Sequence, residues 1–534
     1  MKTYQKKNRA YFICALISIL ISTVFAISLQ FFKGDVLDYA VAGDTKNTIK
    51  YTLLLITFIL CEVCFYFCYK RFSAKFVVGC TKLLKQDIFK SVLQQSYISY
   101  KENQQGEYIA KYTNSADTIK NRHFSMLPSF WEILFRIILV SIALFLLDIR
   151  IAFITIVLLT TPLYIPKLIE KRLQKAQADY IKAVEDTLSK ISDWLSGFEI
   201  IKNYSIERKI MAKFRSVNDD SMEKLLRDMQ LGAIAQLLTT LISYLSYYIV
   251  LVCATWLVII GEFTAGDFFV AIGMIDQLSY PLISLASITR ELIAVKPICK
   301  EMEHFLTTHT DEYAETELKS VVSDIRFNNV TFAYDNQTTI LRDFSFIIKK
   351  GKRYLLKGPS GCGKTTTVNL LLRYYNAQSG SIEIDGVPIE QAGNTYGCMT
   401  VVRQEATLFH DTLRNNLTMF RGISDNKLIQ VMELLGLSKY ANTEALDRIV
   451  TENGGNLSGG EKKRICLARA LLRDTDVLIL DEPLANLDSD TAELIEDLLL
   501  SIQGKTMLIV SHRFSENKLN QFEQVIDFAV NSKI

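Results

Sequence analysis

The sequence predicts a membrane protein in two parts: an all-α transmembrane domain of six helices, followed by an α/β P-loop NTPase domain. Three observations lead to this fold class. Six apolar segments fall within the first 300 residues, two long stretches rich in lysine and arginine separate them, and a glycine-rich phosphate loop stands at 358–365. We place the transmembrane domain at 1–300, a polar linker at 301–324 and the nucleotide-binding domain at 325–534.

The amino-acid composition indicates which partners and which cysteine chemistry to expect. Hydrophobic residues make up 49% of the 534 residues, and 60 basic and 57 acidic side chains leave a net charge of +3. A nearly neutral chain gives no support for a nucleic-acid partner. A secreted disulfide framework is short with regularly spaced cysteines, and this chain with its ten cysteines is neither, so we expect reduced thiols. Those in CEVCFYFC, residues 61–68, fit small residues packed in a membrane helix, and a metal or haem site is the alternative.

The apolar segments define the transmembrane domain. They run over roughly 11–32, 51–69, 133–147, 149–165, 231–260 and 268–288. A helix needs about 20 apolar residues to cross a bilayer, so the third and fourth must extend into less apolar sequence. These two meet at LLDIRI, where Asp148 and Arg150 predict a tight turn. The first segment follows a basic lead, but it is too long for a signal peptide and we expect a retained anchor.

Lysine and arginine predict the orientation of these helices. They are frequent in the lead and in the two stretches of about 60 residues after the second and fourth segments, so both termini and both stretches are expected in the cytoplasm. Helical spacing in these stretches predicts membrane helices that continue far into the cytoplasm. Four charged residues within the spans are candidates for substrate contact: Glu62, Glu132, Arg136 and Asp276. Of these, Glu132 and Arg136 could simply pair with each other.

The second half carries a phosphate-binding motif. RYLLKGPSGCGKTTTVNLLLRYY reads as a strand, a glycine loop and a helix, and it fits G-x-x-x-x-G-K-[ST]. Lys364 is expected to reach the β and γ phosphates of a nucleotide, and the Thr365 hydroxyl to face Mg²⁺. The residues predicted to hold the phosphates are Gly358, Pro359, Ser360, Gly361, Cys362, Gly363, Lys364, Thr365 and Thr366.

Catalytic candidates follow at strand ends. In DVLILDEP, Asp481 is suited to hold Mg²⁺ through water, and Glu482 to activate the attacking water. His512, in VSHRF, is interpreted as a sensor of the γ-phosphate, with a purely structural histidine as the alternative. Gln404, in VVRQEATLF, is expected to reach Mg²⁺ and the attacking water, unless it is a solvated loop residue. Tyr334, in VTFAYDN, is expected to stack on adenine, unless it is an ordinary strand tyrosine.

A second anion-binding loop stands about a hundred residues after the first. LSGGEKKR, residues 457–464, precedes an apolar helical stretch. Backbone NH groups at Ser458, Gly459 and Gly460, at the positive end of that helix, are suited to bind an anion. The chain therefore has two phosphate-binding loops but catalytic residues for only one site.

The order of these motifs resembles that of ATP-binding cassette (ABC) transporters over about residues 325–530. The matching elements are Tyr334, the phosphate loop, Gln404, LSGGE, LILDEP, NLD at 486–488 and His512. The first half resembles the fused exporter type, and SGFEIIKNYSIE at 196–207 resembles its second coupling segment. The chain departs from the family pattern at Thr451, where exporters usually have glycine, and at Glu461, where glutamine is frequent.

The resemblance implies a dimeric site with ATP and Mg²⁺ as cofactors. In this family a signature loop completes the ATP site of a second cassette, and the resemblance assigns that role to Leu457, Ser458, Gly459, Gly460 and Glu461. Asp488 corresponds to the family's D-loop aspartate. The implied metal ligands are Thr365, Gln404 and Asp481, and the implied catalytic residues are Glu482, His512 and Gln404.

We therefore expect an ATPase coupled to transport: a half-transporter that works as a homodimer or heterodimer and exports a small molecule, lipid or peptide. ATP-driven uptake, for example of a metal chelate, is an alternative on the same fold. A membrane sensor that uses ATP only as a switch is an alternative of another class. The expected location is a cell membrane, the inner or plasma membrane of a bacterium, with the bilayer and a second half-transporter as partners.

Overall fold

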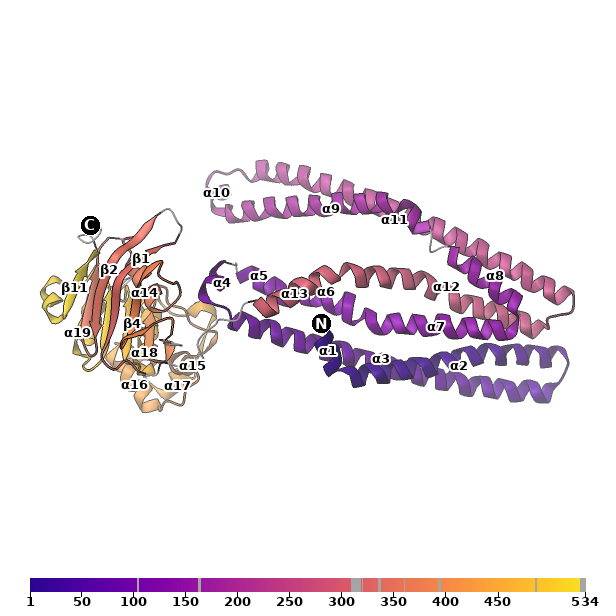
Figure 1. Ribbon diagram of the computed structural model, residues 1–534, viewed down its shortest axis with the longest axis horizontal. Coiled ribbons are helices and arrows are strands. Elements are labelled where there is room, and N and C mark those ends of the chain that lie inside the picture. Colours follow the sequence, from indigo (N-terminus) through magenta and orange to yellow (C-terminus); the bar gives the residue numbers. More distant parts are fainter. Residues whose placement is uncertain are drawn as a thin grey trace. The chain divides into compact units, whose positions relative to one another are not determined.

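The computed structural model describes the chain except for residues 103–104, 162–164, 309–317, 319, 335–337, 360, 392–394, 486 and 529–534. The chain folds into two compact units (Figure 1). The first comprises Met1–Gln94 and Asn103–His309, and the second comprises Gln95–Glu102 and Thr310–Ile534. The first unit is helical, and the strands of the described chain belong to the second.

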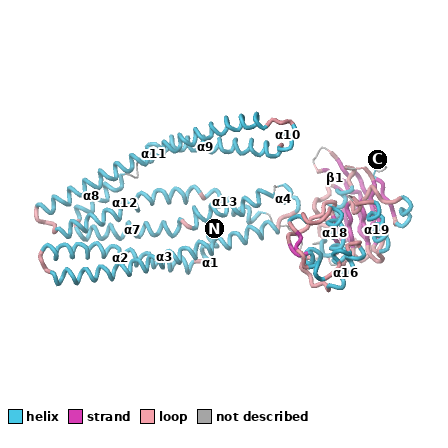
Figure 2. Tube along the Cα trace, turned by 180° about the vertical axis from the view of Figure 1, so that it is seen from behind, coloured by secondary structure: helices cyan, strands magenta, loops and turns pink. Residues whose placement is uncertain are grey.

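Long helices lying side by side build the first unit (Figures 1 and 2). The described helices of this unit, long and short, are α1 (Lys2–Lys7), α2 (Arg9–Val41), α3 (Thr45–Leu93), α5 (Gln105–Ala110), α6 (Ala116–Ile119), α7 (Met126–Leu147), α8 (Ile149–Thr160), α9 (Ile165–Ser196), α10 (Phe198–Asn203), α11 (Glu207–Ile259), α12 (Ala265–Ala294) and α13 (Lys296–Thr308), with π-helical turns at η1 (Lys111–Ser115) and η2 (Lys120–Phe124). The pairs α2–α3 and α9–α11 are hairpins of long helices.

The predicted segments are helical, and they differ in length. Four helical runs are long and apolar enough to cross a membrane among the described residues: Arg9–Val41, Thr45–Leu93, Gln105–Leu147 and Glu207–Ile259. The fourth predicted segment lies on the short apolar helix α8, and residues 162–164 beyond it are outside the described chain. The sixth lies on α12, which has 30 residues. With 49 and 53 residues, α3 and α11 extend well past their apolar parts, as the helical spacing predicted.

Polar side chains cap the amino termini of α8 and α12. The Asp148 carboxylate accepts hydrogen bonds from the backbone nitrogens of Arg150 and Ile151, at 2.8 and 3.2 Å, where α8 starts. Thr264 and Asp267 form a capping box at the start of α12. These caps pair NH groups that a first helical turn leaves without partners. The tight turn predicted at Asp148 is confirmed, since this residue alone separates α7 from α8.

Small residues let α2 and α12 approach closely. A Cβ atom added to Gly266 would lie 2.5 Å from the Gly34 carbonyl oxygen, and one added to Gly34 would lie 2.6 Å from Cγ2 of Val270. The Asp38 carboxylate accepts hydrogen bonds from the Gly266 nitrogen and the Thr264 hydroxyl, both at 2.7 Å. Small residues at helix contacts are typical of membrane helix packing, because dispersion contacts replace the hydrophobic effect in lipid.

The first part of the predicted linker is a helix. Helix α13 covers Lys296–Thr308, so residues 301–308 continue an ordered element. Its buried residues Cys299, Met302 and Phe305 recur every three positions and pack in the core around α3. Ile298 and Leu306 pack against the same core and extend this spacing, so the sequence contains the pattern of an amphipathic helix. The part of the linker at 309–317 and at 319 lies outside the described residues.

The described residues of the second unit form three sheets. A four-stranded antiparallel sheet has the order β2-β1-β4-β5, a five-stranded parallel sheet has the order β11-β3-β10-β9-β6, and β7 pairs with β8. The strands are β1 (Asp324–Ala333), β2 (Thr339–Lys349), β3 (Arg353–Lys357), β4 (Ser379–Ile384), β5 (Val387–Pro388), β6 (Met399–Val402), β7 (Asp411–Thr412), β8 (Ile449–Val450), β9 (Val477–Asp481), β10 (Thr506–Val510) and β11 (Gln524–Asp527).

Helices flank these sheets and complete two hydrophobic cores. They are α4 (Tyr97–Glu102), α14 (Lys364–Leu371), α15 (Leu413–Thr418), α16 (Asp425–Leu434), α17 (Thr443–Leu446), α18 (Gly459–Arg473) and α19 (Ser489–Ser501), with 3₁₀ turns η4 (Thr395–Gly397), η5 (Ser438–Tyr440), η6 (Glu452–Gly454) and η7 (Glu516–Gln521). One core joins the parallel sheet to the antiparallel sheet, and the other joins it to α15–α19. Because β3, β6, β9 and β10 are parallel, their carboxyl ends meet at one edge, where α/β sheets bind ligands.

Candidate functional site

A cavity of about 570 Å³ lies at the carboxyl edge of the parallel sheet. It is lined by Tyr334, Ile340, Gly358, Pro359, Gly361, Gly363, Lys364, Thr365, Thr366, Gln404, Asp481, Glu482, Val510 and His512. The structure thus brings together the predicted phosphate, metal and catalytic residues that it describes. Ser360 lies outside the described residues, and Cys362 stands in the loop beside Lys364.

The phosphate loop has a backbone that only glycine adopts readily. Gly358, Gly361 and Gly363 have φ angles of +147°, +83° and +103°. A Cβ at Gly363 would also lie 2.9 Å from Leu341 Cδ2, so the loop is closed to larger residues there. The Lys364 ammonium donates hydrogen bonds to the Gly358 carbonyl at 2.8 Å and to the Pro359 carbonyl at 2.7 Å. Helix α14 begins at Lys364 and points its amino terminus at the loop, which suits phosphate binding.

The residues predicted to hold magnesium have suitable donor atoms. The Thr365 hydroxyl donates to Oδ2 of Asp481 over 3.5 Å, and Gln404 lines the same cavity. Burial raises the pKa of Asp481 above its usual range, and the nearby guanidinium of Arg403 acts in the opposite direction. Hydroxyl, carboxylate and amide oxygens are the ligands that a hard cation such as Mg²⁺ prefers, so these residues fit that ion.

Glu482 and His512, both predicted to be catalytic, are in contact at this cavity. Oε1 of Glu482 lies 2.8 Å from Nδ1 of His512. Glu482 follows β9 with φ of +51°, and its backbone nitrogen donates to the Val510 carbonyl at 2.8 Å. A non-glycine residue in the left-handed region costs on the order of 1–3 kcal/mol, and such conformations are concentrated at functional sites. The carboxylate is fixed where a water could be activated beside the phosphate loop.

Tyr334 stands at the rim of the cavity. Its side chain is half exposed, and edge-to-face contacts with Phe332 and Tyr375, both with centroids 5.0 Å apart, fix the ring. Its hydroxyl lies 3.1 Å from the Thr366 hydroxyl, a contact that the sequence did not predict. An exposed, oriented ring beside a phosphate loop can stack on a nucleotide base.

The second anion-binding loop is ordered by its own capping box. The Ser458 hydroxyl accepts from the Glu461 nitrogen at 3.2 Å, and a Glu461 oxygen accepts from the Ser458 nitrogen at 2.8 Å. Helix α18 begins with Gly459 and Gly460, and the Tyr440 hydroxyl donates to Glu461 at 3.1 Å. The cavity of about 570 Å³ at the phosphate loop is called the ATP cavity below. Its described lining residues include none from 457–461. The two phosphate-binding loops of the chain therefore do not share one cavity.

Asp488 is a helix cap in this structure. Its carboxylate accepts a hydrogen bond from the Thr491 nitrogen at 3.0 Å where α19 begins. That bond lowers the pKa of Asp488, so the residue carries its charge at neutral pH. Asn486, two residues earlier in the NLD motif, lies outside the described residues.

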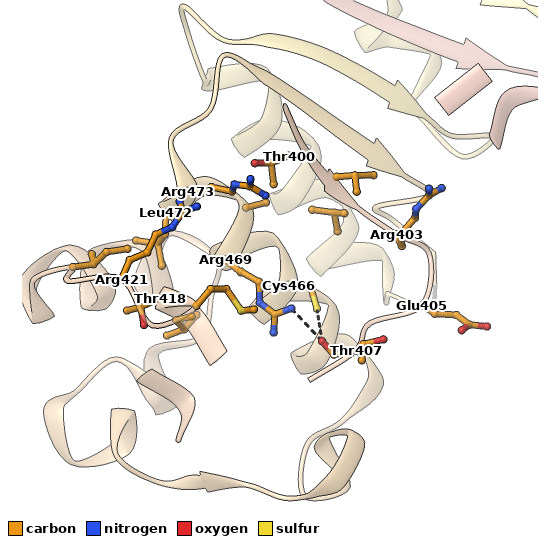
Figure 3. Close-up of a pocket in the computed structure, with 16 residues that line it drawn as sticks. Thr400, Arg403, Glu405, Thr407, Thr418, Arg421, Cys466, Arg469, Leu472 and Arg473 are labelled. Atoms are coloured by element: carbon orange, nitrogen blue, oxygen red, sulfur yellow. Dashed lines mark hydrogen bonds between the residues drawn. The ribbon is translucent and has the colours of Figure 1, made fainter. Parts of the chain in front are cut away.

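A second cavity of about 410 Å³ lies beside the first, and sequence analysis did not predict it (Figure 3). It lies between β6, α15 and α18, and its polar lining is rich in arginine: Arg403, Arg421, Arg469 and Arg473. Arg403 also contacts the ATP cavity, since its Nη1 lies 3.6 Å from Oδ2 of Asp481. The signal for Arg403 was its position directly after a core strand and before Gln404.

Comparisons with known proteins agree with this geometry. A model of the ABC transporter transmembrane region matches residues 10–282, and a model of the ABC transporter family matches residues 341–485. The chain is 28% identical to an ATP-dependent lipid A-core flippase of Photobacterium profundum, over 84% of this chain and 78% of that protein. It is 28% identical to a β-(1→2)glucan export ATP-binding/permease protein of Agrobacterium vitis, over 70% of this chain and 65% of that protein.

The fold is similar to that of a solved exporter. The structure of a bacterial Atm1-family ABC exporter with ATP bound superposes with a TM-score of 0.78 at 22% sequence identity, over 97% of this chain and 93% of that one. Similarity at this level of identity concerns the fold alone. The predicted fold class, a helical transmembrane region followed by an ABC cassette, is confirmed.

Proposed function

The chain belongs to the ABC transporter family, with transmembrane region and cassette in one polypeptide, and from that premise we propose that its dimer exports a small molecule, lipid or peptide, driven by ATP. The named relatives support export, since one is a lipid flippase and another exports a glucan. The proposed domains are a transmembrane domain at 1–300, a connection at 301–324 and a cassette at 325–534. The proposed location is a bacterial inner or plasma membrane with both termini in the cytoplasm.

The observation that carries the proposal is the separation of the two phosphate-binding loops. The loop at Ser458 begins α18, whereas the ATP cavity is lined by the loop at 358–366 and the strand ends. A site that uses both loops therefore needs a second cassette. We infer that Leu457, Ser458, Gly459, Gly460 and Glu461 of one chain close over the ATP held by its partner.

Each residue of the cavity has a distinct role in the proposed reaction. Tyr334 stacks on the base, and the backbone of 358–366 together with Lys364 binds the phosphates. Thr365, Gln404 and Asp481 hold Mg²⁺, which when bound neutralises charge on the phosphate oxygens. Glu482 takes a proton from the attacking water, and His512 orients Glu482 from 2.8 Å away.

The long helices provide the path to transport. Closure of two cassettes on ATP would be carried by α3 and α11, the helices that extend beyond their apolar parts. The transmembrane cavity then changes from facing inward to facing outward, and hydrolysis resets it.

Direction of transport is tested in inverted vesicles and in intact cells. Three probes cover the proposed cargo classes: a fluorescent phospholipid, a cationic dye and a labelled oligosaccharide. Export predicts ATP-dependent accumulation of one probe in inverted vesicles containing the wild type, and no accumulation with Glu482→Gln. Accumulation only in intact cells would instead support uptake. Substrate-independent ATPase activity without movement of any cargo would favour the sensor alternative.

A further inference from the structure

The Arg403 side chain contacts both the proposed metal ligand Asp481 and the aromatic ring of Tyr374. Arg403 follows β6 directly, and its backbone carbonyl accepts a hydrogen bond from the buried Lys463 ammonium at 3.1 Å. Its Nη2 donates to Oδ1 of Asn369 at 2.7 Å. Its Nη1 lies 3.6 Å from Oδ2 of Asp481. Both ends of this residue are therefore fixed, and the guanidinium is held against the proposed metal ligand.

The oxygen of Asp481 that Arg403 contacts is also the one nearest to Thr365. Oδ2 of Asp481 lies 3.5 Å from the Thr365 hydroxyl, so the guanidinium contacts one proposed metal ligand at the atom that contacts another. The Asp481 side chain is only 7% exposed, so solvent screens this charge weakly. A fixed positive charge at that distance attracts the carboxylate and repels a divalent cation.

Aromatic rings hold the guanidinium on its other side. The Cζ atom of Arg403 lies 5.3 Å from the centroid of the Tyr374 ring, within the range of a cation–π contact. The Tyr374 ring is stacked on Tyr97, with centroids 3.8 Å apart and an interplanar angle of 9°. Tyr97 begins α4, which belongs to the cassette unit although α3 and α5 on either side of it in the chain belong to the helical unit.

We infer that Arg403 is a positioning residue of the ATPase site: its guanidinium holds Asp481 in competition with magnesium, and Tyr374 and Tyr97 keep the guanidinium there. The inference rests on the proposed function, since it assigns regulation to the same site. A movement of the segment that carries Tyr97 would loosen the ring of Tyr374, release Arg403 and leave Asp481 free for the metal. The segment between α3 and α5 would thus set how tightly the cassette takes up Mg²⁺.

Metal binding is tested directly, with manganese as a paramagnetic probe. Full-length protein carrying Glu482→Gln is saturated with ATP and titrated with Mn²⁺, and the free ion is followed by EPR. Adding Arg403→Met removes the charge and keeps the length of the side chain. We expect about three- to tenfold tighter Mn²⁺ binding, since one nearby positive charge is lost. Arg403→Lys, which keeps the charge, should shift the affinity less.

The aromatic link is tested by a double-mutant cycle. Tyr97→Leu should tighten Mn²⁺ binding when Arg403 is present and have no effect when Arg403→Met is also present, because residues in one network are not additive. Tyr100→Leu, an exposed tyrosine on the same helix, is the matched control. Binding of a fluorescent ATP analogue without metal verifies that each variant is folded.

Two results would overturn the inference. Unchanged or weaker Mn²⁺ binding by Arg403→Met would show that the guanidinium does not compete with the metal. If Tyr97→Leu changed the Mn²⁺ affinity equally with and without Arg403, Tyr97 would not act through Arg403. These outcomes are separate from failure of the proposed function, because a wild type that binds ATP without hydrolysing it would contradict export while leaving the titration interpretable.

Discussion

Nδ1 of His512 and Oε1 of Glu482 lie 2.8 Å apart at the ends of neighbouring parallel strands. The left-handed backbone of Glu482 and its hydrogen bond to the Val510 carbonyl fix the position of this residue. In the proposed function, the contact joins the base to the residue that positions it, beside the phosphate loop.

Replacing Glu482 by glutamine keeps the shape of the side chain and removes the base. A positioned general base contributes about 10²–10⁴ to a rate, so Glu482→Gln should hydrolyse ATP at least roughly 100-fold more slowly. ATP binding should stay near the wild-type value. Substantial turnover by the purified variant would remove Glu482 from this role.

His512→Ala should lower the ATPase rate chiefly through Glu482. Residues that act as a unit are strongly non-additive, so the variant with both His512→Ala and Glu482→Gln should be about as slow as Glu482→Gln alone. Steady-state phosphate release from the three variants checks this. Independent, multiplying effects would mean that His512 acts on the nucleotide without Glu482.

Tyr334→Ala should weaken ATP binding by roughly tenfold, since one base–aromatic stack is worth about 1–3 kcal/mol. Tyr334→Phe keeps the ring and loses only the contact with the Thr366 hydroxyl at 3.1 Å. It should bind ATP almost as well as the wild type. If phenylalanine proves as damaging as alanine in equilibrium binding, the hydroxyl contact matters and stacking does not.

Motifs that are local in the sequence predicted most of the site. The phosphate loop and four predicted side chains lie at the end of a short apolar strand or within two residues of it, and parallel pairing brings such positions to one edge: Asp481, Glu482, Gln404 and His512. The same rule would have drawn attention to Arg403. Its partners were beyond prediction, because Tyr97 and Tyr374 are far apart in the chain and only the folded cassette places them in contact.

The helices of the first unit were predicted less completely than the residues of the site. The turn at Asp148 followed from two charged residues between apolar runs, and the structure confirms it. The helix α13 was assigned to a linker, since its buried residues Cys299, Met302 and Phe305 alternate with charged positions and their burial depends on packing with α3. The apolar spacing from Ile298 to Leu306 was nevertheless present in the sequence, and the linker assignment did not use it.

The central claim, that two chains share each ATP, is tested by a cysteine that the phosphate loop already contains. Ser458→Cys is introduced into protein that keeps Cys362 and has its other cysteines replaced by serine or alanine. A disulfide requires Cα atoms within about 7 Å, so one forms only if the loop at residue 458 closes over a phosphate loop. Excess ATP should shield Cys362 from alkylation in the reduced protein, which verifies that the site is intact.

Mild oxidation of the nucleotide-trapped protein is the decisive measurement. A shared site predicts a band at twice the chain mass of 60.8 kDa, about 122 kDa, that disappears with reductant. A cross-link to a co-purifying homologue with its own phosphate-loop cysteine would show that the dimer is heteromeric. A disulfide formed only within one chain would contradict the account.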